Sequence, residues 1–132
     1  KNIEDGKKIL KRYAISLFIV SITFITLFTL FNQQIVSLVL GENFRDYYFL
    51  LPVLSIGFSF LIFGYLFENI CFAYKKTWGV FFIEGTAAIT NIIILPVMIY
   101  NFGIKGIPYA LLFVYIAHCI SGFIITRKIL KQ

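Results

Sequence analysis

Four long stretches with almost no charge constrain what this chain can fold into. They cover residues 13–31, 47–74, 77–100 and 106–126, and the only charged residues inside them are Glu68 and Glu84. A helix needs about 20 residues to cross the hydrocarbon core of a bilayer, so each stretch is long enough. None shows the apolar–polar alternation of a membrane β-strand. The sequence therefore predicts an all-α membrane protein, with four transmembrane helices packed as two antiparallel hairpins.

The overall composition excludes a water-soluble globular domain. Of the 132 residues, 60% are apolar and only 14% are charged, and the mean hydropathy is +0.90. Soluble chains are about half apolar and about a quarter charged. The net charge of +6 comes from short basic clusters between the apolar stretches, a pattern typical of membrane flanks. Membrane lipid is therefore an expected partner, and nucleic acid is not.

The basic residues also predict an orientation, because cytoplasmic flanks carry an excess of Lys and Arg. Ten of them fall in the lead 1–12, the second connection and the tail 127–132, whereas the two other connections hold only Arg45 and Lys105. The ten are Lys1, Lys7, Lys8, Lys11, Arg12, Lys75, Lys76, Arg127, Lys128 and Lys131. Both ends of this segment are predicted to be cytoplasmic. The connection 32–46 is then predicted to lie outside. Its apolar residues 35–40 are expected to form a short turn in the interface that ends at Gly41.

Three ionisable residues fall inside the predicted spans, namely Glu68, Glu84 and His118. Each lies seven to nine residues from a flanking Lys or Arg, which places all three about 10 to 14 Å inside the cytoplasmic end of a helix. Ionisable groups at such depth are expensive in lipid and usually face a bundle interior or a hydrated cavity. They predict a cluster that binds a proton or a cation, with Asn91 as a deeper polar contact. A purely structural role, as ion pairs with each other or with the nearby lysines, is the alternative.

Small residues and a proline mark further features of the spans. Gly57, Gly64 and Cys71 recur every seven residues beside Glu68, which favours a close helix contact, and packing alone explains this stripe equally well. Pro96 lies inside the third predicted span and removes one helical hydrogen bond. It is a possible hinge, with an ordinary proline near a helix end as the alternative.

The sequence holds no pattern typical of an enzyme or a metal protein. No Ser–His–Asp set, no Cys and His spacing for zinc and no Gly-rich phosphate loop occurs. We therefore expect no catalytic residue, no bound metal and no cofactor.

Five short motifs give a resemblance to a known family. They are LGENF at 40–44, LPVL at 51–54, AYKKT at 73–77, NIIILP at 91–96 and NFGIKG at 101–106. In this order and spacing, after a basic lead, the sequence resembles the C-terminal part of bacterial polysaccharide export proteins. These are flippases of lipid-linked oligosaccharides, in the same superfamily as the multidrug and toxin extrusion transporters.

The resemblance implies that the chain is a piece of a longer transporter of about twelve helices in the bacterial cytoplasmic (inner) membrane. It implies three partners: a polyprenyl-linked oligosaccharide, the rest of the same transporter chain, and the polysaccharide polymerase machinery. Two other functions stay open. One is a multidrug or cation antiporter of the same superfamily. The other is a non-transporting membrane scaffold, or a subunit of an enzyme whose active site lies on another chain.

Overall fold

The computed structural model describes residues 3–131, with side chains from Leu10 onward, and these residues are almost entirely helical. Lys1 lies outside the described residues, and so do the side chains of Lys7 and Lys8. The elements are α1 (Ile3–Leu30), α2 (Asn32–Leu40), the 3₁₀ helix η1 (Glu42–Tyr47), α3 (Leu50–Ala73), α4 (Thr77–Phe102), the 3₁₀ helix η2 (Gly103–Lys105) and α5 (Gly106–Ile129). The described part of the chain contains no β-strand, which confirms the predicted all-α class.

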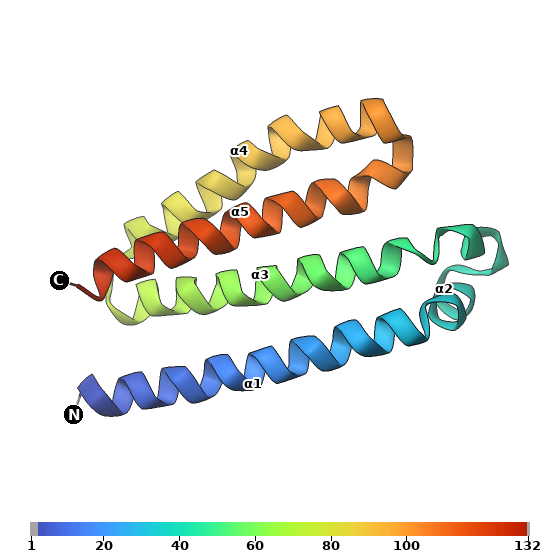
Figure 1. The fold of residues 1–132 in the computed structure, drawn as a ribbon. Coiled ribbons are helices and arrows are strands. Elements are labelled where there is room, and N and C mark those ends of the chain that lie inside the picture. The colour runs from blue at the N-terminus through green and yellow to red at the C-terminus, as the bar shows by residue number, and fades with distance from the viewer. Residues whose placement is uncertain (1–2, 132) are drawn as a thin grey trace.

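Three of the helical segments are long and apolar enough to cross a membrane. They are Leu10–Leu30, Leu50–Ala73 and Thr77–Ile129. The last has 53 residues because it contains both α4 and α5, and the chain reverses direction between them at η2 (Figure 1). Large apolar side chains point outward from every long helix; Phe81 and Ile92, for example, are each 74% exposed. These features fit a membrane-embedded protein, since lipid rather than water solvates such a surface.

The four long helices lie side by side in the order α1, α3, α5, α4 (Figure 1). α5 packs extensively against both α3 and α4, whereas α3 and α4 contact each other much less. Among the long helices, α1 makes substantial contacts only with α3, and it packs far less tightly against α3 than α5 does. α3 and α5 run in the same direction, opposite to α1 and α4, so α1 begins and α5 ends at the same end of the bundle (Figure 1). The helix order places α5 at the centre of the α3–α5–α4 unit.

Glycines explain how closely α3 and α5 approach. A Cβ on Gly57 would lie 3.2 Å from Tyr115 Cδ2, and a Cβ on Gly122 would lie 2.9 Å from the Phe67 side chain. Gly57, Gly64 and Cys71 are all buried, as the predicted small-residue stripe requires. Small residues let apolar helices approach closely enough for van der Waals packing to hold them together.

The turn between α3 and α4 is short and closed by two backbone hydrogen bonds. The amide of Lys75 donates to Phe72 O and the amide of Lys76 donates to Cys71 O, both at 2.9 Å. Lys75 adopts the left-handed conformation with φ +56°, at the position where helices usually carry glycine. Only three residues separate the end of α3 at Ala73 from the start of α4 at Thr77, and the two helices run in opposite directions. The turn therefore brings the last turn of α3 and the first turn of α4 to one level.

The connection between α1 and α3 consists of two short helices rather than a loop. The predicted break after the first span is present, since α1 ends at Leu30 and α2 begins at Asn32. The apolar residues 35–40 belong to α2, and Gly41, with φ +88°, ends it. η1 follows, so α3 begins at Leu50 rather than at Tyr47, where the uncharged stretch starts.

Candidate functional site

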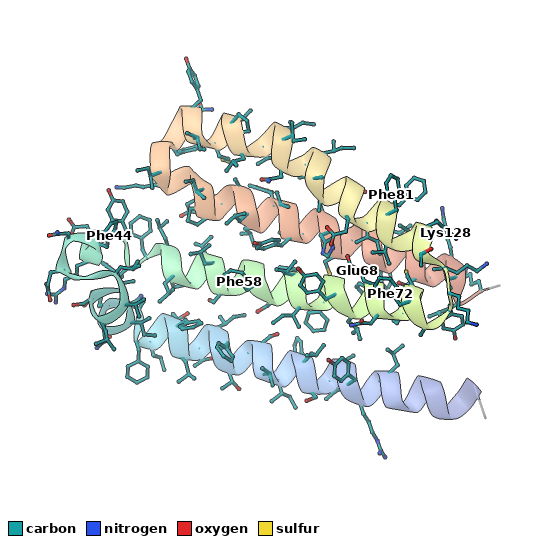
Figure 2. All side chains as sticks on the ribbon, turned by 180° about the vertical axis from the view of Figure 1, so that it is seen from behind. Phe44, Phe58, Glu68, Phe72, Phe81 and Lys128 are labelled. Carbon is teal, nitrogen blue, oxygen red and sulfur yellow. The ribbon has the colours of Figure 1, made fainter. Side chains whose placement is uncertain are left out.

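His118 is the centre of a three-residue cluster to which α3, α4 and α5 each contribute one side chain. The imidazole is buried, with 2% of the residue exposed. Its Nε2 lies 2.9 Å from Oε1 of Glu68 on α3 and 3.9 Å from Oε1 of Glu84 on α4. Figure 2 labels Glu68 where the three helices meet. The cluster therefore joins helices whose ionisable residues are far apart in the sequence.

The local sequence of α3 creates the space that the imidazole occupies. Gly64 lies one turn before Glu68, and a Cβ at Gly64 would overlap the imidazole at Nδ1 and Cε1. The Tyr65 ring meets the imidazole edge to face, with centroids 5.8 Å apart. Gly64 thus admits the ring of His118 against the α3 backbone, while Glu68 provides its hydrogen-bond partner.

The two nitrogens of His118 have different surroundings. Nε2 faces both glutamates, whereas Nδ1 is buried and has no hydrogen-bond partner among the described residues. A neutral imidazole with its proton on Nε2 donates that proton to the Glu68 carboxylate. All polar interactions of this buried ring are therefore made on the side of the two carboxylates.

The two glutamates differ in their access to the surroundings. The Glu68 side chain is only 9% exposed, whereas that of Glu84 is 55% exposed. Glu84 and His118 both line an open groove of about 260 Å³. The other residues that line this groove are Leu61, Tyr65, Ala87, Ala88, Asn91, Val114 and Tyr115. Glu84 therefore connects the buried Glu68–His118 pair to an open space.

Asn91 lies two turns beyond Glu84 along α4 and lines the same groove. Its Oδ1 atom is buried and accepts no hydrogen bond within the described part of the chain. A buried amide oxygen without a partner is uncommon and carries a free-energy penalty. Asn91 consequently keeps an unused acceptor beside the groove, two turns from Glu84 along α4.

Four of the five candidate residues predicted from the sequence meet at this one site. Glu68, Glu84, His118 and Asn91 all belong to the cluster or the groove, whereas Pro96 lies further along α4 and lines none of it. The structure does not contain the alternative ion pairs between these glutamates and the nearby lysines. No Lys or Arg nitrogen of the described residues lies within 4.0 Å of Glu68 or Glu84. The paired arrangement is between the glutamates and the histidine.

The cluster also has the composition of a cation site. One ligand atom from each of Glu68, Glu84 and His118 can be chosen so that all three lie within 4.8 Å of one another. Two carboxylates and an imidazole suit a proton shared among them or a divalent cation. The three members come from three helices, and their shared distance from the flanking basic residues is what predicted that they meet.

Sequence reasoning missed the two tyrosines of the groove. Tyr65 and Tyr115 both line it, and the Tyr115 ring packs against Phe58 with centroids 5.7 Å apart. Tyr65 follows Gly64 and precedes Glu68 by three residues, a helical spacing that places it near the same face. Tyr115 precedes His118 by the same spacing, so the signal was present on both helices.

No known protein family, curated protein or solved structure matches this chain. The resemblance to polysaccharide export proteins accordingly rests on the five short motifs, and the site rests on its own geometry.

Proposed function

We propose that this chain is part of a bacterial transporter that moves a polyprenyl-linked oligosaccharide across the cytoplasmic membrane, and that it is not an enzyme. The observation that carries the proposal is the meeting of Glu68, Glu84 and His118 beside an open groove, within helices that are otherwise apolar. Ionisable groups inside a membrane are costly and usually serve a substrate or ion pathway. The motifs shared with polysaccharide export proteins supply the substrate class.

In this proposal α1, α3, α4 and α5 all cross the membrane and form part of one lobe of a larger transporter of about twelve helices. Both ends of the segment are then cytoplasmic, as the distribution of Lys and Arg favours. The weakly packed α1 provides a surface for the remaining helices of that lobe. Two such lobes rocking about a central cavity give alternating access to the two leaflets.

The geometry of His118 suggests how an ion acts on the helices. Nε2 is within hydrogen-bond distance of Glu68, at 2.9 Å, whereas Glu84, at 3.9 Å, is too far away for a hydrogen bond. A proton or cation bound to Glu84 neutralises the carboxylate, and this weakens the attraction between α4 and the imidazole on α5. The cluster then has two arrangements, one with His118 bound to α3 alone and one with α4 drawn in. A transporter needs a two-state element of this kind for coupling.

The test uses cells that lack the intact gene and carry it back as wild type, Glu68→Gln or Glu42→Gln. Surface polysaccharide and lipid-linked oligosaccharide retained in the membrane are quantified together. Glu68→Gln keeps the side-chain size but removes the charge, so we expect lost surface polymer and accumulated precursor with normal protein in the membrane. Glu42 is an exposed carboxylate on η1, so its variant serves as the matched control and should restore export. Normal polymer and precursor with Glu68→Gln would refute the role of the cluster, and normal levels without the gene would refute the substrate.

A cation or multidrug antiporter of the same superfamily is the second candidate. The three converging ligand atoms favour it, because a cation site can couple to the export of many substrates. The same gene deletion distinguishes the two: an antiporter changes drug sensitivity and leaves the surface polysaccharide intact.

A further inference from the structure

A second groove lies at the opposite end of the helices from the α3–α4 turn. It measures about 370 Å³, and its walls come from α2, η1, α3, η2 and α5. The apolar side chains that line it include Val36, Leu40, Phe44, Leu54 and Leu111. Figure 2 labels Phe44 at this end of the molecule. Its volume is within the range of small-molecule sites, at the lower end.

The groove is positioned at a membrane boundary. Leu54 and Leu111 lie inside the apolar spans, whereas Tyr47, which also lines the groove, belongs to the charged segment that contains Arg45 and Asp46. Tyrosines with one apolar and one polar end prefer the interface between lipid and water. The groove therefore extends from the interface into the level of the acyl chains.

A positive charge lies against Tyr47, one of the residues that line the groove. Lys105 Nζ is 5.5 Å from the centroid of the Tyr47 ring and 5.8 Å from that of Phe49, so two aromatic faces hold the ammonium beside the groove. No carboxylate of the described residues lies within 4.0 Å of it, whereas the nearby Arg45 is paired with Glu42 at 3.6 Å. Lys105 thus combines a defined position with an unpaired charge.

We infer that this groove binds an anionic phospholipid of the adjoining leaflet, with one acyl chain along the apolar walls and its phosphate against Lys105 Nζ. The charge of Lys105 and the depth of the groove together select this occupant, because a ligand must be apolar at one end and anionic at the other. A soluble protein presents no such group within the bilayer. The inference concerns a site separate from Glu68, Glu84 and His118 and does not depend on what the protein transports.

Native mass spectrometry of the full-length protein in mild detergent tests this site. Phosphatidylglycerol and phosphatidylcholine with identical acyl chains are titrated, and the apparent Kd of the first bound lipid is compared. One Lys near an anionic headgroup strengthens binding about fivefold, so we expect phosphatidylglycerol to bind about fivefold more tightly. Lys105→Gln should abolish this preference, and its control Lys76→Gln, at the other end of the helices, should keep it.

A second pair of variants tests the apolar wall. Leu54→Trp fills the groove and should weaken the binding of both lipids, whereas Ile56→Trp, on a part of α3 that does not line the groove, should leave both unchanged. Three results would overturn the inference: equal binding of the two lipids by wild type, an equal effect of both lysine variants, or a dimer that Leu54→Trp dissociates, which would assign the groove to a second copy. Displacement of phosphatidylglycerol by a polyprenyl phosphate at equimolar concentration would instead assign it to a transported lipid.

Discussion

At the scale of single residues, the site depends on the missing side chain of Gly64. The Gly64→Ala variant places a methyl group where the imidazole of His118 lies, and this buried ring is packed between helix backbones. Overpacking of this kind costs about 1–3 kcal/mol of stability. We expect Gly64→Ala to lower the midpoint of thermal unfolding in detergent. Gly85→Ala is the control, since a Cβ there meets nothing within 4 Å, and an unchanged midpoint for both variants would contradict the packing described.

The two glutamates should also respond differently to truncation. Glu68→Ala removes the hydrogen-bond acceptor of a buried imidazole whose other nitrogen already lacks a partner, which costs about 1–3 kcal/mol. Glu84→Ala removes a half-exposed carboxylate at 3.9 Å, so its effect should stay within about 0.5 kcal/mol. Unfolding by urea or heat in the same detergent measures both. A larger loss for Glu84→Ala would show that the pairing of His118 is with α4.

At the scale of helices, the turn between α3 and α4 carries a lysine where a glycine fits better. Lys75 has φ +56°, a conformation that costs a residue with a Cβ about 1 kcal/mol. Lys75→Gly should therefore raise the stability of the α3–α4 turn by about that amount. Lys75→Ala removes the same charge and retains the strain, so it should give no gain. Equal effects of the two variants would show that the charge, and not the backbone, sets the stability.

The positions of the helices could be predicted from the sequence, whereas which helices pack against one another could not. Long uncharged stretches fix where a membrane helix must lie, so the sequence anticipates α3, α4 and α5 to within a few residues of their bounds. An apolar helix has no polar face to reveal its partner, and the placement of α5 between α3 and α4 follows from contacts of single glycines. The shared depth of Glu68, Glu84 and His118 predicted their proximity, but the tighter pairing with Glu68 depends on Gly64. Whether Pro96 is a hinge stays a prediction.

At the scale of the whole molecule, the access of water to the groove beside Glu84 distinguishes a transporter from a non-transporting scaffold. In a background with Cys71 and Cys119 replaced by alanine, Ala87→Cys lies in the groove and Ile92→Cys lies on the outer surface of α4. A membrane-impermeant, water-soluble thiol reagent should label Ala87→Cys when that side is exposed to it. It should spare Ile92→Cys, which lipid covers. Silence at both positions would favour the scaffold, and labelling at both would place α4 in water.

The helix order also has a consequence for how the protein is made. α5 is synthesised after α3 and α4, yet it packs between them and carries His118. Until it inserts, Glu68 and Glu84 stand in the membrane without their imidazole partner, and the contact surfaces of both helices face lipid. We therefore expect the bundle without α5 to be less stable than the complete bundle and to present more surface to membrane proteases and insertion chaperones. The insertion of α5 therefore completes the site and covers the contact surfaces of α3 and α4 in the same step.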